Sequence, residues 1–346
     1  MSIVVMRDES ISIAKAIAIL LMVLAHTYFS QYGNQWINMF HMPLFFFFAG
    51  FCFKEKYILN SKDFIQKRVK GLYKPFIKWS LIFLLLHNVF YHVNIYNGEY
   101  GFHGEVSQLY SSKEFALHAI HIVTRMTDNE QLLGGYWFLR SLFVGSVLGY
   151  LVIKYSKKWI YGGGFLLLLT IGLSYMNIRM PYFEIGARDT FAALFFISGH
   201  YYKVLNCKIH EKYFILPIGI LFVTFGVRFY QSTLLNFEWW QVIPYMVTAL
   251  TGLLSVFYFS TKIFCNNGGF RKLLIYIGNN TLVILTWHML YFKIVSLLII
   301  HVYGLPIARL AEFPVIEEYS KQGWFILYFI IGVSIPLLLS KCKYFK

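Results

Sequence analysis

A lysine and a histidine interrupt an otherwise apolar stretch near the N-terminus. Residues 13–29 read IAKAIAILLMVLAHTYF, with Lys15 and His26 eleven positions apart. Eleven residues of α-helix make about three full turns and rise ~16 Å, so the two side chains share one helix face. A neutral imidazole takes a proton from a hydroxyl and returns it near pH 7, which makes a buried histidine a natural general base for acyl transfer to an alcohol.

Two further histidines fall at a similar predicted depth. His41 lies in FHMPLFF and His288 lies in TLVILTWHML, each within an apolar segment. Together with His26 they predict a polar cavity shared by three helices. The alternative for the first pair is structural: Lys15 extends to the cytoplasmic headgroups and His26 is a hydrogen-bonded or interfacial imidazole.

Carboxylates are absent from the predicted membrane interior, and the cysteines show no metal-binding pattern. All 16 Asp and Glu residues fall in loops or at the ends of apolar segments. This excludes a carboxylate dyad, a two-metal carboxylate site and a proton relay built on buried acids. The four cysteines, Cys52, Cys207, Cys265 and Cys342, have no zinc-like or CxxC spacing and are all expected on the cytoplasmic side, so we predict neither a disulfide nor a metal site.

The composition is that of an integral membrane protein. Of 346 residues 58% are hydrophobic and 14% charged, and the mean hydropathy is +0.57, whereas soluble domains have roughly 25% charged residues. We expect an all-α bundle of about ten transmembrane helices, forming a single domain over residues 1–346. The predicted spans are 11–30, 37–53, 72–93, 135–153, 159–177, 189–205, 213–230, 241–260, 273–297 and 323–340.

Lysine and arginine alternate between the loops, as the positive-inside rule requires, and place both termini in the cytoplasm. The net charge of +15 is thereby explained without nucleic acid, by topology and anionic lipid. The cytoplasmic loop KEKYILNSKDFIQKRVKGLYK, residues 54–74, is more basic than topology requires. A phosphate-rich cytoplasmic ligand is a second interpretation of this loop.

The first span lacks a small-residue cleavage site and is interpreted as a retained helix rather than a signal peptide. The longest segment outside the membrane is about 94–134. Within it SSKEFALHAIHIVTRM, which starts at Ser111, predicts a helix with candidate capping serines at Ser111 and Ser112. Its apolar positions favour a helix that lies against the outer membrane surface.

Five motifs in order resemble a known family. They are the Lys15–His26 spacing, FHMPLFFFFAGF, FIQKRVKGLYKPF, YWFLRSLFV and IGNNTLVILTWHML, spread over residues 7–292. Together they resemble the membrane-bound acyltransferase family 3, in particular its fucose 4-O-acetylase-like branch of polysaccharide-modifying enzymes. The resemblance implies a ten-helix core that uses cytoplasmic acyl-CoA, usually acetyl-CoA, to acylate a sugar hydroxyl of a glycan or glycolipid at the outer face.

The resemblance also assigns Lys15 and His26 as the essential pair. Where relatives often read DIAKG, this chain reads SISIAKA, with Ser12 in place of the acid and Ala16 in place of glycine. Asp8 and Glu9 become the candidate counter-ions of Lys15. The chain lacks the appended extracytoplasmic hydrolase-like domain of some members, so we expect the helix bundle itself to serve the acceptor.

Other candidate site residues follow from the same hypothesis. Four basic residues are expected to hold the phosphates of acyl-CoA: Lys67, Arg68, Lys70 and Lys74. His41, Asn279, Asn280 and His288 would orient the acceptor or stabilise the oxyanion. Arg140, Trp137, Tyr136 and Asn280 are candidates for contact with the acceptor. The structural alternatives are a snorkelling Arg140, interfacial aromatics at Tyr136 and Trp137, and helix capping by Asn280.

A different class of function stays open: a transporter or flippase of a lipid-linked saccharide that uses the same cavity without covalent chemistry. Both functions place the chain in a cell membrane as a multi-pass protein, most simply a bacterial inner membrane. The pattern does not define the acceptor sugar, its hydroxyl, the acyl chain or the oligomeric state.

Overall fold

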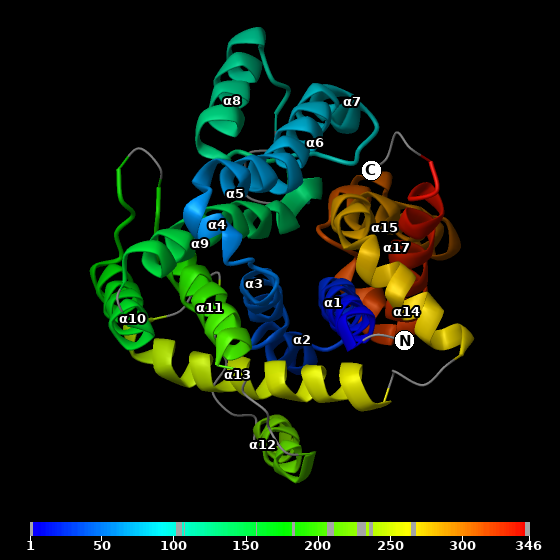
Figure 1. Ribbon diagram of the computed structural model, residues 1–346. Helices are drawn as coiled ribbons and strands as arrows, with labels where there is room; N and C mark the ends of the chain where they lie inside the picture. Colours follow the sequence, from blue (N-terminus) through cyan, green and yellow to red (C-terminus); the bar gives the residue numbers. More distant parts are fainter. Residues whose placement is uncertain are drawn as a thin grey trace. The chain divides into compact units, whose positions relative to one another are not determined.

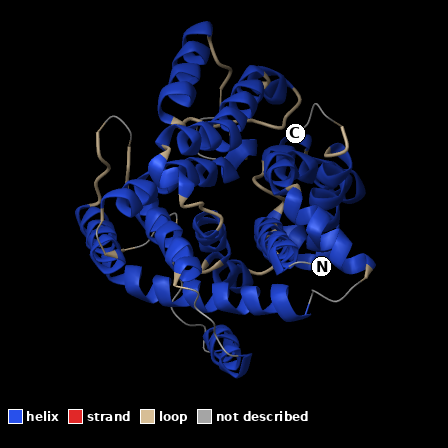
Figure 2. Cartoon of the chain, in the orientation of Figure 1, coloured by secondary structure: helices blue, strands red, loops and turns tan. Residues whose placement is uncertain are grey.

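The fold is built almost wholly from helices (Figure 1, Figure 2). The computed structural model describes residues 3–101, 106, 108–156, 158–181, 184–205, 211–226, 233–234, 238–263 and 268–342. Besides helices, an isolated antiparallel bridge joins Met180 and Ile185. The predicted all-α class is therefore confirmed.

The chain divides into two compact units. The first comprises Met1–Met22, Gln35–Leu72 and Ser141–Asn279, and the second comprises Val23–Asn34, Tyr73–Arg140 and Asn280–Lys346. Helix α1 (Ile3–His26) contributes its first part to one unit and its last turn to the other. The single-domain organisation stays a prediction.

In the first unit, α3 and α11 pack closely because two glycines let their backbones approach. A Cβ on Gly50 would lie 1.7 Å from the carbonyl oxygen of Phe196, and one on Gly199 would lie 2.0 Å from that of Phe47. Such small residues are what allow membrane helices to touch along their backbones. The helices of this unit, besides α1, are α2 (Gln31–Asn38, shared with the second unit), α3 (His41–Phe51), α4 (Lys56–Leu59), α5 (Ser61–Arg68), η1 (Val69–Tyr73, whose last residue belongs to the second unit), α9 (Trp137–Tyr155, whose first four residues belong to the second unit), α10 (Trp159–Met176), α11 (Ala187–Val204), η3 (Glu211–Phe214), α12 (Ile215–Gly226), η4 (Trp239–Gln241), α13 (Val242–Tyr258), η5 (Phe259–Ile263) and α14 (Gly269–Asn279).

In the second unit, α15 (Thr281–Tyr303) packs against α17 (Phe325–Leu339) and η2 (Gln131–Tyr136). Helix α15 ends at Gly304, whose φ of 65° lies in the left-handed region that glycine adopts without strain. The other helices of this unit are α6 (Lys74–Leu85), α7 (His87–His92), α8 (Ser112–Arg125), η6 (Ile307–Ala311), α16 (Glu317–Tyr319) and η7 (Ser320–Trp324).

The predicted outer helix is present as α8. The Oγ of Ser111 accepts a hydrogen bond from the backbone N–H of Glu114, and the Glu114 carboxylate accepts from the backbone N–H of Ser111. This reciprocal pair is the capping box that the sequence predicts at Ser111. The helix is confirmed, while its position at the membrane surface stays a prediction.

Five helical stretches are long and apolar enough to cross a membrane. They are Glu9–His26, Gln131–Tyr155, Trp239–Lys262, Thr281–Tyr303 and Glu317–Leu339, and shorter apolar helices run over Ile160–Met176 and Ile215–Phe225. The membrane class is thus supported by length and composition, and the count of ten spans stays a prediction.

Three of the expected spans are interrupted helices. The segment 37–53 changes from α2 to α3 after Asn38, the segment 72–93 changes from α6 to α7 at Leu86, and the segment 273–297 breaks at Asn280. A hydropathy window averages over these breaks because apolar residues flank each one. The interruption at Asn280 starts α15 eight residues later than the predicted boundary at 273.

Candidate functional site

His26 is the last residue of α1 and its position is fixed by backbone contacts. The helix ends there because Tyr28 adopts a φ of 52°, in the left-handed region that terminates helices. The Thr27 hydroxyl donates to the Leu24 carbonyl at 2.7 Å, and the Ser320 hydroxyl donates to the Thr27 carbonyl. The second unit therefore holds the end of α1 firmly.

His26 and His288 meet directly, which is the contact at the centre of the candidate site. The Nδ1 of His26 lies 2.9 Å from the Nε2 of His288. The ring planes differ by 9° and the ring centres lie 5.2 Å apart, as expected for two imidazoles that meet edge to edge in one plane. The structure thus brings together two of the three histidines for which the sequence predicts a shared cavity.

The hydrogen bonds assign a tautomer to both rings. The Nδ1 of His288 lies 2.9 Å from the Ile284 carbonyl and 3.1 Å from the Leu285 carbonyl, so it carries the proton. In the neutral ring the Nε2 of His288 is then an acceptor, and the Nδ1 of His26 must donate to it. This chain leaves the lone pair of a neutral His26 on its Nε2.

His288 is buried beside an aromatic side chain. His288 is fully buried, and the Phe292 ring stands edge-on to it with centres 5.6 Å apart. On the same helix the Thr286 hydroxyl lies 2.7 Å from the Tyr136 hydroxyl and donates to the Leu282 carbonyl at 2.8 Å. The neutral hydrogen bonds gain strength in a medium with little water.

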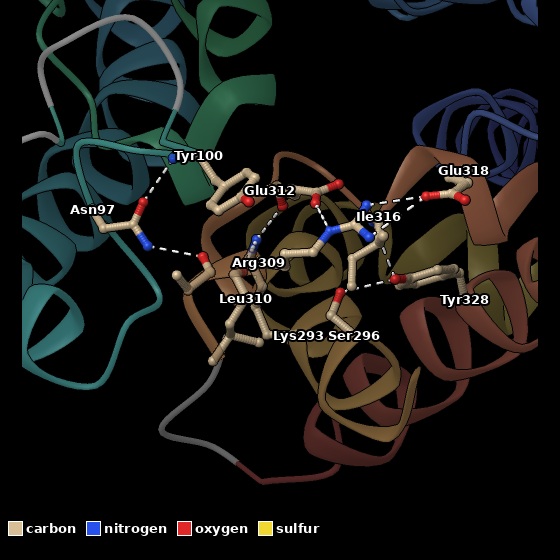
Figure 3. A network of polar contacts seen from close by, with 11 residues as sticks. Asn97, Tyr100, Lys293, Ser296, Arg309, Leu310, Glu312, Ile316, Glu318 and Tyr328 are labelled. Carbon is tan, nitrogen blue, oxygen red and sulfur yellow. Dashed lines mark hydrogen bonds and ion pairs between the residues drawn. The ribbon is translucent and has the colours of Figure 1, made fainter. Parts of the chain in front are cut away.

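A second polar network fixes α15 one turn beyond His288 (Figure 3). Lys293 is buried, and its ammonium donates to the carbonyls of Leu310 at 2.9 Å and Glu312 at 2.6 Å. Arg309 pairs with the carboxylates of Glu312 and Glu318. These contacts satisfy a charge inside the helix bundle and tie α15 to the segment that follows it.

Further hydrogen bonds in this network join α15 to α17. The Ser296 and Tyr328 hydroxyls lie 2.8 Å apart, and the Tyr328 hydroxyl accepts from the backbone N–H of Ile316 at 3.3 Å (Figure 3). Asn97 donates to the Ala308 carbonyl at 2.8 Å. The helix that carries His288 is therefore held along most of its length.

Lys15 lies in the first unit, on a part of α1 that is attached to α14. A Cβ on Gly278 would lie 1.8 Å from the Ser12 carbonyl oxygen, and the Ser12 hydroxyl donates to the Asn279 side chain at 2.9 Å. Ser12 therefore connects two helices. Asn279 bonds to α1 through this contact, and its predicted role in orienting the acceptor or stabilising the oxyanion stays a prediction.

The two candidate counter-ions of Lys15 have different outcomes. Glu9 forms an ion pair with Arg271 of α14. The side chain of Asp8 lies outside the described part of the structure. The pairing of Glu9 with Arg271 again links α1 to α14, and the counter-ion of Lys15 is not identified among the two candidates.

Two other predicted site residues, His41 and Asn280, lie in different units. His41, in the first unit, is buried, and its Nδ1 donates to the Ile37 carbonyl at 2.9 Å. Asn280 occupies the N-cap position of α15 without a side-chain capping bond. Asn280 thus has the position that the helix-capping alternative predicts, but its side chain makes no capping hydrogen bond. The catalytic role of His41 stays a prediction.

The candidate acceptor residues near the start of α9 are more buried than an interfacial belt implies. Tyr136 is fully buried, and Arg140, 8% exposed, donates through Nε to the Arg125 carbonyl at 3.3 Å. Arg125 is the last residue of α8, where unsatisfied carbonyls attract cations. Arg140 thus holds α8, and Trp137 is half-buried beside Phe138.

The predicted donor-binding residues divide into two groups. Lys67 donates to the Tyr57 hydroxyl at 3.3 Å, and Arg68 lies over the Phe64 ring, 5.1 Å from its centre. Lys70 and Lys74 are exposed. Lys70 belongs to the first unit with Lys67 and Arg68, whereas Lys74 belongs to the second.

Sequence reasoning missed a buried ion pair in the second unit. The Nδ1 of His87 lies 2.9 Å from the Glu130 carboxylate, and the ring stacks on Tyr110 with centres 3.5 Å apart. Burial raises the pKa of the Glu130 carboxyl, while the hydrogen bond from His87 opposes that rise. The two residues are 43 positions apart, and no local pattern signals the pair.

Two of the four cysteines and the possible metal-binding groups can be described in the structure. Cys52 and Cys342 are free and exposed, whereas Cys207 and Cys265 lie outside the described residues. No group of three or more His, Cys, Asp or Glu side chains placed to hold a metal ion occurs within the described ranges.

Comparison with known families adds one finding. A family model described as an acyltransferase domain matches residues 8–341. No curated protein and no solved structure gives a significant match. The matched region spans nearly the whole chain and includes every residue of the candidate site.

Proposed function

The chain belongs to this acyltransferase family and is a membrane acyltransferase, and from this premise we propose that it acetylates a hydroxyl group of an extracytoplasmic glycan or glycolipid. The proposed donor is cytoplasmic acetyl-CoA. The proposed general base is His26. The observation that carries the proposal is the 2.9 Å contact between His26 and His288, in a tautomer that leaves the His26 Nε2 lone pair as the basic site.

The chemistry follows from that tautomer. The Nε2 of His26 removes the proton of the acceptor hydroxyl as its oxygen attacks the thioester carbonyl. The new C–O bond forms, the C–S bond breaks, and the protonated His26 returns the proton to the departing CoA sulfur. His288 accepts the hydrogen bond from the His26 Nδ1–H throughout and stabilises the imidazolium, so we assign it as a positioning residue.

Other predicted residues take supporting roles in this proposal. Lys15 lies on the His26 face of α1, about three turns towards the donor side, where a cation favours the negative charge of the tetrahedral intermediate or of CoA. Tyr136, Trp137, Arg140 and Asn280 flank the start of α9 and of α15 and are proposed to shape the acceptor side. His41 is retained as a proposed acceptor-orienting residue.

The expected test of the proposal is the loss of acetyl transfer in His26→Ala. General-base catalysis contributes about 10²–10⁴-fold, so the variant should lose at least about a hundredfold in rate. The measurement is the O-acetyl signal in NMR spectra of surface glycans, together with mass spectrometry of the same material. His301→Ala is the matched control, because His301 is an exposed histidine of α15.

The outcomes separate the two classes of function. Loss of the O-acetyl group in His26→Ala, with wild-type levels in His301→Ala, supports the acyltransferase mechanism. An undiminished O-acetyl signal in His26→Ala sinks the general-base assignment. A change in the amount of surface saccharide without a change in its acetylation supports the transporter instead.

A further inference from the structure

Four cations of the first unit surround one cluster of aromatic side chains. The aromatic cluster consists of Phe53, Tyr57, Phe64, Tyr150 and Phe196. The cations are Lys67, Arg68, Lys154 and Lys203. We propose that these cations, called here the cation rim, bind the phosphate groups at the nucleotide end of the donor CoA, with Lys154 and Lys203 as binding residues beyond the basic loop 54–74.

The aromatic cluster gives the rim a rigid base. The Phe64 and Tyr150 rings stack with centres 4.6 Å apart, and Phe53 contacts Phe64 at 5.5 Å and Phe196 at 5.9 Å between ring centres. These rings come from the segment after α3, from α5, from α9 and from α11, and all are buried. Aromatic packing of this kind fixes the backbone positions from which the cations extend.

Each cation is held in place by a neutral oxygen. Lys154 donates to the Ser61 hydroxyl at 2.9 Å, which in turn lies 2.5 Å from the Tyr150 hydroxyl. Lys203 donates to the Phe53 carbonyl at 3.1 Å. Lys154 and Lys203 thereby extend from α9 and α11 onto the same segment that carries Lys67 and Arg68.

Arg68 is the most enclosed member of the rim. Its guanidinium lies 5.1 Å from the centre of the Phe64 ring and 5.5 Å from that of Phe196, and it donates to the Ala49 carbonyl at 3.5 Å. A guanidinium over two ring faces keeps its charge while it loses water. It remains able to donate to a phosphate in two places, because the guanidinium has five N–H groups and one of them is directed at the Ala49 carbonyl.

No described carboxylate forms an ion pair with the rim, and the acid that acts on this region, Glu55, interacts electrostatically with His200. Among the side chains that the structure describes, no carboxylate oxygen lies within 4.0 Å of a nitrogen of these four cations. Like charges brought together on a partly buried surface repel, and an anion removes that cost. The rim therefore favours a ligand with concentrated negative charge.

A buried histidine beside the rim also favours a bound ligand. His200 is 4% exposed, its ring stands edge-on to Phe53 with centres 5.1 Å apart, and its Nδ1 has no hydrogen-bond partner in the structure. An unsatisfied buried polar atom costs free energy. A ligand at the rim that reached His200 would remove that cost.

Membrane topology explains only part of this arrangement. Lys154 and Lys203 each precede the last residue of a helix, where a cation is favourable and where the positive-inside rule expects lysine. Neither rule requires the two ammonium groups to converge on one aromatic cluster. The convergence, rather than the number of lysines, carries the inference.

The nature of the ligand rests on the proposed function. Acetyl-CoA carries a diphosphate and a 3′-phosphate, which match a group of cations without carboxylates. The headgroups of anionic lipids offer the same phosphate chemistry, so the experiment must distinguish the two sources.

The test compares two double variants of the full-length protein in phosphatidylcholine nanodiscs. Lys154→Gln with Lys203→Gln removes two rim charges, and Lys158→Gln with Lys272→Gln removes two exposed charges of the same unit outside the rim. Calorimetry with CoA should show about a tenfold weaker affinity for the rim variant and less than about a twofold change for the control. Lys154→Arg with Lys203→Arg should restore most of the affinity, which excludes misfolding.

Three outcomes decide the proposal. If pantetheine, which lacks the nucleotide, binds all variants equally while CoA does not, the rim binds the phosphates. Equal CoA affinity in the rim and control variants overturns the proposal. If only the binding of phosphatidylglycerol vesicles falls in the rim variant, the rim holds lipid headgroups and the CoA assignment is wrong.

The same measurements keep this inference distinct from the proposed function. His26→Ala should bind CoA as the wild type does while losing acetyl transfer. If it keeps acetyl transfer, the general base is wrong but the rim is still tested by CoA affinity. If the rim variants keep CoA affinity, only the phosphate site is wrong.

Discussion

The histidine pairs of the second unit and the cation rim of the first unit hold their ionisable side chains differently. In the second unit two histidines each contact an ionisable partner, His87 with Glu130 and His26 with His288. In the first unit the members of the cation rim rest on neutral oxygens and aromatic rings and form no ion pair with a described carboxylate.

This difference teaches what each unit is suited to do. A fully paired network needs no ligand to be stable, and it holds a reacting nitrogen in one tautomer and one orientation. A group of cations without a carboxylate partner gains stability when an anion arrives. In our proposals, therefore, the histidine pair of the second unit serves proton transfer and the cation rim of the first unit serves recognition of a charged substrate.

The largest effect on this contrast is expected from His288. His288→Leu removes the acceptor of the His26 Nδ1–H, so His26 loses its fixed tautomer and a partner for its positive charge. The rate of acetyl transfer should fall about a hundredfold, with CoA affinity unchanged. The measurement is the rate against pH for purified protein with acetyl-CoA and a saccharide acceptor.

His288→Gln is the matched control for that experiment. Its side-chain oxygen accepts the same hydrogen bond without titrating, so part of the rate should return. A pH profile of His288→Leu that overlays the wild type would show that His288 does not act through His26, and the contrast between the units would lose its main support.

An intermediate effect is expected from the α3–α11 contact of the first unit. Gly50→Ala places a methyl group 1.7 Å from the Phe196 carbonyl oxygen. Backbone cannot yield as a side chain does, so the free energy of unfolding should fall by about 3 kcal/mol. Thermal unfolding in detergent measures the change, and Gly172→Ala, which meets nothing within 4 Å, is the control.

Amide exchange sharpens the same experiment. In Gly50→Ala, exchange should accelerate in α3 and α11 and stay unchanged in α15 of the second unit. Equal acceleration in α15 would show that the two units unfold as one.

The smallest effect is expected at the capping box of α8. Hydrogen bonds from the Ser111 backbone and hydroxyl lower the pKa of Glu114 below its ordinary 4.5. Because the folded value lies below the unfolded one, this stabilisation is present above pH 4.5 and is lost as the pH falls through the folded value. The amides of the first turn of α8 should therefore exchange faster at acidic pH.

Glu114→Gln provides the control for this pH dependence. The variant should show the faster exchange at every pH, with no acid transition. An acid transition that persists in Glu114→Gln would assign the effect to another group, such as Asp128, which lies 2.6 Å from His121.

Local patterns predicted the elements better than their interruptions. The Ser111 capping box and the apolar faces of α1, α9 and α17 follow from neighbouring residues, and the structure has them. The breaks at Leu86 and Asn280 do not, because the mean hydropathy of each segment averages over the break, and the break at Asn280 coincides with the boundary between the two units. The extent of each apolar segment could be predicted, while the number of helices in it could not.

The candidate site shows the same division. The proximity of His26 and His288 agrees with the predicted shared cavity, because buried imidazoles on apolar helices each need a partner, whereas their direct contact is known only from the structure. Lys154 and Lys203 could not, because a lysine at a helix end is already explained by topology. Their convergence on Phe53 and Ser61 depends on tertiary packing, which no spacing along the chain records.

The edge-to-edge contact of the two imidazoles also bears on the cost of holding charge in a bilayer. The self-energy of an ion in a medium of low polarity falls as its charge spreads over a larger radius. In the mechanism we propose, His26 accepts a proton, and the 2.9 Å contact with His288 would let both rings carry part of the positive charge. In that proposal the pair behaves as one larger cation, and replacing the hydrogen between the rings by deuterium should change the rate of acetyl transfer.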